Sequence, residues 1–387
     1  MNFKIKGLKI LDCILGRAAG SLARAFIQPR SGESNRTQNF SVTTESQKKL
    51  KILVIRPGGI GDAALLYPFL KALKGHFNNS EIDVLAEKRN SGIFVGCAYV
   101  NEVFLYDSGP FFALYKTLKK NYDIVIDSEQ WHRLSAVFAY LTRAPIRIGF
   151  ATNNRSELFT HAVPYSQDQY EVFSFLNLAS TITGDNYEFN NMSPFIPIDR
   201  KLVSKFSLQI NGLRKRCAAI AGIFSGATIP ERRWGISKFV ALTEGLINEG
   251  FGIVIIGGNE DLDDSVKLEE IANGDVTINY AGKTSLIETA AIISQLDLLV
   301  SSDTGLMHIA YGVGTPTVSL FGAGIQKKWA PIGNSNIALN KRLPCSPCTR
   351  FGYTPKCSYE VRCLSDISVE EAKGAVLELV SRLEGHN

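Results

Sequence analysis

Three short polar segments of this 387-residue chain carry side chains suited to binding or activating a substrate, and each joins a strand-like run to a helical one. The first is Arg56-Pro-Gly-Gly-Ile-Gly-Asp62. Gly58, Gly59 and Gly61 allow a ligand to approach the backbone closely. Asp62 comes at the helix start, where a carboxylate either faces a substrate cleft or serves as a helix cap or first-turn acid.

The second segment runs from Ser225 to Trp234. The hydroxyls of Ser225 and Thr228 and the backbone N–H groups suit phosphate oxygens, with Arg232 or Arg233 supplying positive charge. The alternative is a polar surface loop with exposed arginines.

The third segment, Ser301-Ser-Asp-Thr-Gly-Leu-Met-His308, again leads from a strand into a helix. Asp303, Thr304 and Gly305 put N–H and hydroxyl donors at a helix N-terminus, which suits a diphosphate. His308 follows one turn after Thr304 on the same helix face. A lone histidine is commonly a core or capping residue, but three such loops converging on one cleft favour a site.

Two nucleotide-binding motifs fail on counting. Ile60 stands where the dinucleotide fingerprint G-x-G-x-x-G needs its second glycine. Gly282-Lys283-Thr284 resembles the end of a P-loop, but Thr277 occupies the position of the required earlier glycine. The sequence therefore disfavours an NAD-dependent dehydrogenase and a P-loop ATPase.

The elements that must position these loops form two similar series, in which strands alternate with helices, as in parallel sheets with right-handed crossovers. The first series has predicted strands at 51–56, 81–86, 102–106, 123–127 and 146–149. The second has strands at 218–224, 252–256, 276–279, 298–301 and 317–321, helices at 237–248, 262–273, 286–295 and 306–313, and a final helix at 368–383 with Ser368 and Glu371 in a capping box. Residues 186–213 read as an irregular connection.

These patterns predict an α/β chain of two doubly wound, Rossmann-like domains facing a cleft. Ligands of such sheets collect at the carboxyl ends of the strands. We expect an N-terminal helix and linker over residues 1–49, a first domain over 50–205 and a second over 206–387.

Composition limits the possible partners. A hydrophobic fraction of 45% and a charged fraction of 20% fit large folded cores. The net charge of +5 permits anionic substrates but is too small to indicate nucleic acid. Apolar residues at helical spacing between Phe3 and Phe26, with six basic residues over 4–30, predict a helix that lies on an anionic membrane or packs on the protein itself.

The three loops together resemble glycosyltransferase family 9, the ADP-heptose:lipopolysaccharide heptosyltransferases. The similarity covers residues 51–370, and the stretches that carry it are Ile55-Arg-Pro-Gly-Gly-Ile-Gly-Asp62, Ala281-Gly-Lys-Thr-Ser-Leu-Ile-Glu-Thr-Ala-Ala291, Asp303-Thr-Gly-Leu-Met-His308 and Gly314-Thr-Pro-Thr-Val-Ser-Leu-Phe-Gly322. The resemblance implies the two-domain GT-B fold, with the acceptor held by the N-terminal half and the nucleotide-sugar donor by the C-terminal half.

By the same resemblance, Asp62 matches the general base, and Arg56, Gly58, Gly59 and Gly61 belong to the acceptor-side loop. The implied donor contacts are Ser225, Thr228, Arg232, Glu260, Lys283, Thr284, Asp303, Thr304, Gly305 and His308. At Arg232 the family has lysine, so the charge is kept while its geometry changes.

These roles imply an inverting, metal-independent transfer of a heptose from ADP-L-glycero-D-manno-heptose to a lipopolysaccharide core or related surface glycan. Asp261-Leu-Asp263 has Asp-x-Asp spacing but opens a predicted surface helix, so we expect no catalytic metal. Two alternatives stay open: a nucleotide-sugar epimerase of GT-B fold, and a non-catalytic nucleotide-sugar or glycan-binding scaffold.

Four of the seven cysteines cluster at Cys345, Cys348, Cys357 and Cys363. The first pair has zinc-knuckle spacing, and four thiolates would complete a structural zinc site. The alternative is a set of thiols that brace a loop without a metal. An odd cysteine count favours a reducing, cytoplasmic compartment, with peripheral contact to the inner membrane if the N-terminal helix lies on it.

Overall fold

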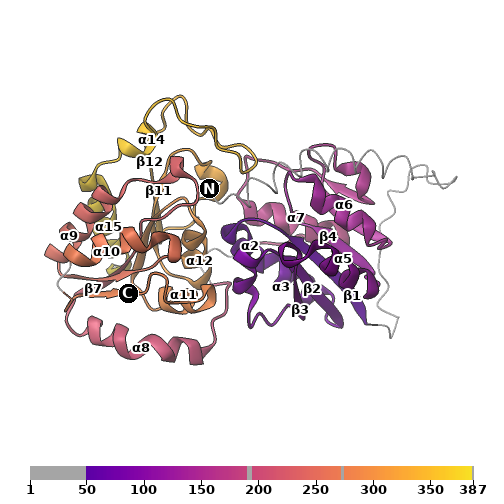
Figure 1. The fold of residues 1–387 in the computed structure, drawn as a ribbon, viewed down its shortest axis with the longest axis horizontal. Coiled ribbons are helices and arrows are strands. Elements are labelled where there is room, and N and C mark those ends of the chain that lie inside the picture. The colour runs from indigo at the N-terminus through magenta and orange to yellow at the C-terminus, as the bar shows by residue number, and fades with distance from the viewer. Residues whose placement is uncertain (1–48, 190–193, 272–273, 386–387) are drawn as a thin grey trace. The chain divides into compact units, whose positions relative to one another are not determined.

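The computed structural model describes residues 49–189, 194–271 and 274–385 (Figure 1). The predicted N-terminal helix and most of the predicted linker lie outside the described residues. The chain divides into two compact units: residues 1–59 with 66–189, and residues 60–65 with 190–387. In the part of the chain that the structure describes, no helix is both long and apolar enough to span a bilayer.

The N-terminal unit is built on a parallel six-stranded sheet in the order β3-β2-β1-β4-β5-β6. Its strands are β1 (Leu50–Arg56), β2 (Ser80–Ala86), β3 (Glu102–Leu105), β4 (Ile124–Asp127), β5 (Ile146–Phe150) and β6 (His161–Val163). The helices that follow are α3 (Tyr67–His76), α4 (Lys88–Ser91), α5 (Pro110–Lys119), α6 (Arg133–Leu141) and α7 (Glu171–Thr183). Branched and aromatic side chains such as Leu53, Ile55 and Val125 form a buried core on this sheet.

The C-terminal unit repeats the same architecture with the strand order β12-β11-β10-β7-β8-β9. Its strands are β7 (Ala219–Phe224), β8 (Phe251–Ile255), β9 (Thr277–Asn279), β10 (Leu298–Ser302), β11 (Thr317–Phe321) and β12 (Asn336–Asn340). Its longer helices are α8 (Arg200–Arg214), α9 (Ile236–Asn248), α10 (Leu262–Ile271), α11 (Leu286–Ile293), α12 (Gly305–Val313) and α15 (Val369–Glu384), with short α13 (Gln326–Trp329) and α14 (Arg362–Ser365).

Both sheets have the strand order of the Rossmann fold, 3-2-1-4-5-6 when each is numbered along the chain. Successive strands are added toward one edge of the sheet up to β3 or β9 and toward the other edge from β4 or β10. The order therefore switches between β1 and β4 in one sheet and between β7 and β10 in the other, and such switch points are where these folds bind ligands. The predicted pair of doubly wound α/β domains is therefore confirmed. The capping box before α15 is also present, since Glu371 N–H donates to Ser368 Oγ at 3.0 Å.

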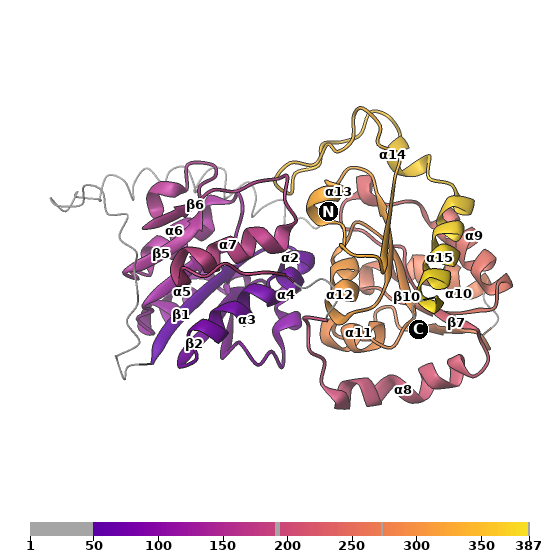
Figure 2. The same cartoon turned by 180° about the vertical axis from the view of Figure 1, so that it is seen from behind.

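The prediction of an irregular connection over residues 186–213 was wrong in its second half, because α8 begins at Arg200. Asp199 caps this helix, and Phe206, Ile210 and Leu213 recur at helical spacing and are buried. The helix runs beside α11, with Ser207 Oγ donating to Gln295 Oε1 at 2.9 Å (Figures 1 and 2). For this reason the unit boundary falls at residues 189 and 190 rather than at the expected 205 and 206.

One short helix, α2 (Ile60–Leu65), follows β1 directly in the sequence but groups with the C-terminal unit. Its contacts there are with α12. The expected helical segment after β1 is thus divided between two helices, α2 and α3, which belong to different units.

Candidate active site

The residues that follow the carboxyl end of β10 include a buried carboxylate and lead into the N-terminus of α12. All five residues of β10 are buried, and Asp303 follows them with 4% of its surface exposed. A Cβ built on Gly324 would lie 1.9 Å from Asp303 Oδ2, so only a glycine at position 324 leaves room for this carboxylate. Thr304 then precedes the first turn of α12 in extended conformation.

Arg232 forms an ion pair with Asp303, with Nη1 and Oδ2 3.1 Å apart. The arginine stands at the end of a short 3-10 helix (Pro230–Arg232) in the loop that follows β7. Its side chain is 18% exposed, so the ion pair is largely withdrawn from solvent. The pair fixes a positive charge beside the N-terminus of α12, where an anionic ligand is favoured.

His308 is buried on the first turn of α12, 4% exposed, with its ring 6.0 Å from that of Trp329. Burial lowers the pKa of His308 to about 4, although the charges of Asp303 and Asp62 act in the opposite direction. The imidazole is therefore neutral near pH 7 and carries one N–H donor and one acceptor.

Several polar atoms around this helix start are buried without a hydrogen-bond partner among the residues that the structure describes. They are Ser302 Oγ, Thr304 Oγ1 and His308 Nδ1. Buried polar groups are nearly always hydrogen-bonded, so unpartnered ones need an explanation. Three of them within seven residues make this helix start a candidate site for a polar ligand.

Asp62 lies on the first turn of α2, and α2 packs against α12 within the C-terminal unit. A Cβ on Gly61 would fall 2.3 Å from His308 Cδ2, and one on Gly305 would fall 2.8 Å from Ile60 Cβ. The two glycines therefore permit the close approach of the two helices. Asp62 remains partly exposed, and its charge reaches His308.

The other predicted donor residues follow β7, β8 and β9, the strands beside β10 in the sheet. Ser225 is buried directly after β7, while Thr228 is exposed in the same loop. Glu260 is exposed after β8, and Lys283 is exposed after β9, donating to Asn279 O at 2.9 Å. Since the strands are parallel, all these loops meet at one edge of the sheet, and Thr284 belongs to the same edge.

Asp261 was misjudged from the sequence, which assigned it to the start of a surface helix. It is 6% exposed and accepts a hydrogen bond from Gly258 N–H at 2.9 Å. A Cβ on Gly226 would lie 2.1 Å from its Oδ1, so the carboxylate fills the space between the loops after β7 and β8. The glycines at 226 and 257, whose added Cβ atoms would meet Asp261, were the sequence signal for this close packing.

In the N-terminal unit, the buried side chain of Arg56 links the loop after β1 to Glu129. Arg56 is 1% exposed; its Nη2 lies 2.9 Å from Glu129 Oε2, and its Nε donates to Pro57 O at 2.8 Å. Burial alone would raise the pKa of Glu129, but His132, Arg56 and Arg155 lower it to about 2. The guanidinium expected on the acceptor side is thus engaged within the protein, where it stabilises the loop that contains Gly58 and Gly59.

A family model for "Glycosyltransferase family 9 (heptosyltransferase)" matches residues 111–357. The chain belongs to glycosyltransferase family 9. It is accordingly an enzyme that transfers a glycosyl group.

Curated relatives of this family 9 member agree. It is 28% identical over 296 residues to lipopolysaccharide heptosyltransferase 3 of Escherichia coli, a match covering 72% of this chain and 85% of the relative. It is 24% identical over 291 residues to lipooligosaccharide heptosyltransferase 2 of Haemophilus influenzae, covering 70% and 83% of the two chains.

Solved structures share the fold. The family 9 glycosyltransferase of Veillonella parvula superposes with a TM-score of 0.72 at 21% identity, over 87% of this chain and 99% of that one. Escherichia coli heptosyltransferase WaaC with ADP superposes with a TM-score of 0.66 at 18% identity, over 85% and 100%. The predicted GT-B fold is confirmed by these likenesses.

The cysteine segment of this glycosyltransferase packs against residues 322–324, the turn that leaves room for Asp303. Cys348 N–H donates to Ala323 O at 3.1 Å, and a Cβ on Gly322 would lie 2.7 Å from Cys363 Sγ. Burial, together with the nearby thiols of the other three cysteines, raises the pKa of Cys363 to about 11. Across the described residues, no three His, Cys, Asp or Glu side chains are arranged to hold a metal, so the zinc site stays a prediction from the sequence.

Proposed function

We propose that this glycosyltransferase transfers a heptose from ADP-heptose to a lipopolysaccharide-core acceptor, with inversion and without a metal ion. The relatives named above are lipopolysaccharide and lipooligosaccharide heptosyltransferases. Structural neighbours were solved with ADP and with ADP-2-deoxy-2-fluoro heptose. We also propose that the N-terminal unit, which ends at residue 189, binds the acceptor and that the C-terminal unit, which continues from residue 190, binds the donor. The enzyme is proposed to work in the reducing cytoplasm, which suits its free thiols.

The observation that carries the proposal is the proximity of α2 to the N-terminus of α12. The helix start offers unpartnered donors at Thr304 and His308 and a fixed cation at Arg232. A carboxylate on α2, Asp62, is close enough to influence His308. A helix start suited to an anion and a candidate base therefore lie close together, which supports a displacement reaction on a nucleotide sugar.

In the proposed reaction, Asp62 accepts the proton of the acceptor hydroxyl while that oxygen forms a bond to the anomeric carbon. The bond from this carbon to the diphosphate oxygen breaks, and ADP leaves with the electron pair. Arg232, Lys283 and the N-terminus of α12 stabilise the charge that develops on ADP. A single displacement inverts the anomeric centre.

The decisive test is the Asp62→Asn variant. Asparagine keeps the shape of the side chain but does not accept the proton, so transfer should fall by roughly 10²–10⁴-fold. ADP affinity, measured by calorimetry, should stay within about twofold because the anion-binding groups are unchanged. Asp263→Asn, an exposed carboxamide exchange on α10, is the matched control and should leave both quantities unaltered.

An equal loss of ADP binding and transfer in Asp62→Asn would assign Asp62 to donor binding and refute the base. The same assay separates the functions that the sequence left open. A transferase releases ADP from ADP-heptose only when an acceptor glycan is added. An epimerase would convert the donor without acceptor, and a binding scaffold would do neither.

A further inference from the structure

Helix α5 in the N-terminal unit exposes two aromatic side chains to solvent. Among its described side chains, Ala113 (3% exposed) and Thr117 (0%) are buried, and Thr117 Oγ1 donates to Ala113 O at 2.9 Å. Phe112 and Tyr115 point outward and are 64% and 54% exposed. A helix that only covers a sheet buries its aromatic side chains, so this outward pair is unexplained by the packing of the unit.

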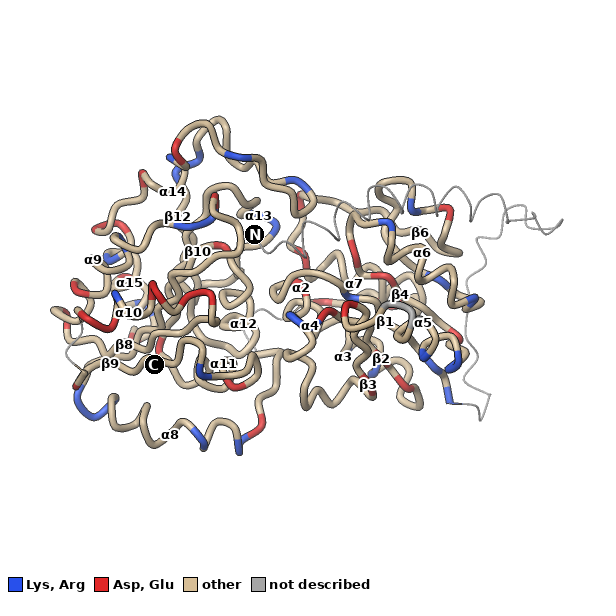
Figure 3. Tube along the Cα trace, viewed as in Figure 1, with Lys and Arg blue, Asp and Glu red and all other residues tan. Residues whose placement is uncertain are grey.

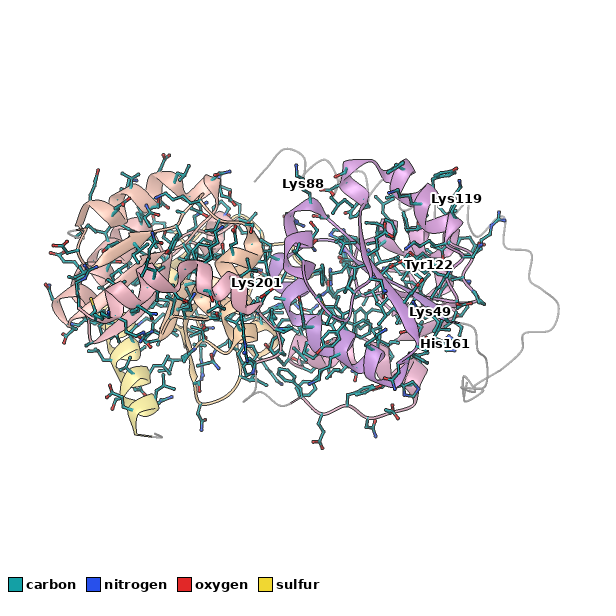
Figure 4. All side chains as sticks on the ribbon, turned by 90° about the horizontal axis from the view of Figure 1, so that it is seen from below. Lys49, Lys88, Lys119, Tyr122, His161 and Lys201 are labelled. Atoms are coloured by element: carbon teal, nitrogen blue, oxygen red, sulfur yellow. The ribbon has the colours of Figure 1, made fainter. Side chains whose placement is uncertain are left out.

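Two lysines accompany the rings on the same face. Lys116 Nζ lies 4.8 Å from the centre of the Phe112 ring, and Lys119 Nζ lies 4.4 Å from that of Tyr115. Residues 112, 115, 116 and 119 are spaced i, i+3, i+4 and i+7, so they form a single stripe. Figure 3 shows Lys and Arg positions in blue beside the label of α5, and Figure 4 labels Lys119 at the surface of the N-terminal unit.

No acidic residue occurs between Pro110 and Lys120, so the stripe is not neutralised from its own helix. On the adjacent strands, Asp83 and Glu102 each hold the ammonium of Lys120, at 2.7 Å and 2.8 Å. Asp107, in the short 3-10 helix before α5, accepts a hydrogen bond from Lys88 N–H at 2.9 Å. The exposed face thus combines two aromatic rings with two lysines.

We propose that this face of α5, formed by Phe112, Tyr115, Lys116 and Lys119, binds the headgroup region of an anionic phospholipid bilayer. Aromatic rings are favoured at the level of the headgroups, and lysines are attracted to anionic lipids. A protein partner fits less well, because a stable protein interface needs about 20–30 residues on each side. A few rings and lysines are enough for reversible attachment to a membrane.

Such attachment would hold the enzyme at the surface where a lipid-linked acceptor resides. The inference does not depend on which glycan that acceptor carries, nor on the assignment of Asp62. Each lysine near an anionic surface contributes about fivefold to affinity. The two lysines together should therefore change vesicle binding by roughly 25-fold.

The test is flotation of the full chain with vesicles of phosphatidylcholine alone and of phosphatidylcholine with 30% phosphatidylglycerol. Lys116→Gln/Lys119→Gln should bind the anionic vesicles roughly 25-fold more weakly than the wild type, and Phe112→Ser/Tyr115→Ser should also bind more weakly. The matched controls are Lys215→Gln/Lys356→Gln and Leu208→Ser/Val266→Ser, which remove the same charge or exposed apolar side chains elsewhere. If the α5 variants bind like their controls, the proposal fails.

A second measurement excludes interference from the basic residues 1–48. Phe112→Trp places an indole in the stripe, and vesicles containing brominated lipid quench indoles that enter the headgroup or acyl region. Vesicle-bound Phe112→Trp should lose more emission than bound wild type, whereas Leu208→Trp should not. An unquenched indole at position 112 in bound protein would overturn the proposal, even if the protein floats.

Discussion

At the scale of single residues, the Arg232–Asp303 pair determines how charge is held at the start of α12. Arg232→Met leaves the buried Asp303 carboxylate without its partner, which costs about 2–3 kcal/mol of unfolding free energy once the partial exposure of Arg232 is considered. We also expect transfer to slow by roughly 10²-fold, since a cation beside the leaving group is lost.

Arg232→Lys should recover most of the stability and part of the rate, because it keeps the charge but not the planar fork. Arg382→Met on α15 is the control, since it removes an exposed arginine that pairs with Glu378 and not with Asp303. Urea denaturation and single-turnover kinetics give the two quantities. Unchanged stability and rate in Arg232→Met would contradict the assigned role.

His308 predicts a pH dependence of stability. Its pKa is about 4 in the folded chain and 6.5 in the absence of burial, so the unfolded chain takes up a proton first as the pH falls. The stability contributed by the neutral ring is complete above about pH 6.5 and decreases progressively toward pH 4. The full loss is about 3 kcal/mol.

Urea midpoints at pH 7 and pH 4.5 measure this loss. His308→Asn should show a shallower decline over this interval than the wild type. A wild-type slope in His308→Asn would show that another group is responsible.

At the scale of elements, the contact between α2 and α12 depends on glycine. Gly61→Ala puts a methyl group 2.3 Å from His308 Cδ2, so one helix must move. We expect a loss of about 1–3 kcal/mol in stability and a strong fall in transfer, because Asp62 moves with α2. Gly75→Ala on α3 is the control, since its added Cβ meets nothing within 4 Å. Equal activity of the two variants would argue against a role for the contact.

The cysteine segment allows a metal prediction. If Cys345, Cys348, Cys357 and Cys363 bind zinc as the sequence suggests, purified protein contains one zinc per chain. Chelation should then lower the melting temperature and weaken ADP binding, since the segment supports the turn at Gly324 beside Asp303. Cys348→Ser should lose the metal and Cys217→Ser should retain it. Metal-free protein with full activity would contradict the zinc site and favour the alternative, in which the thiols brace the loop without a metal.

Most of the fold was predictable because buried parallel strands are read directly from branched runs such as those of β1 and β10. Helix α8 was missed because only Phe206, Ile210 and Leu213 mark its buried face among many polar residues. The loops of the candidate site were predicted, since glycines and the first residues of helices mark where a strand leads into a helix. The inward orientation of Arg56 and Asp261 was not, because burial of a charge depends on partners distant in sequence such as Glu129.

At the scale of the whole molecule, each unit has its own hydrophobic core, so ligand effects can be assigned to one unit. We expect ADP alone to slow hydrogen exchange at residues 225–235, 257–262, 281–285 and 303–308. Helix α2 should be protected with them, and β4 to β6 should not change. Mass spectrometry of peptic peptides measures this, and protection confined to the N-terminal sheet would contradict the assignment of the donor site.

The grouping of α2 with the C-terminal unit has a consequence for dissecting the gene. A fragment that starts at residue 190 folds around a complete sheet but lacks Asp62, since that carboxylate is encoded more than a hundred codons upstream. We expect such a fragment to retain nucleotide affinity and to lack the proposed base. A synthetic peptide that covers residues 60–65 should not replace it, because the native helix is tethered at both ends. Exchanging N-terminal halves between relatives at the 189/190 junction would therefore exchange the proposed base together with the proposed acceptor site.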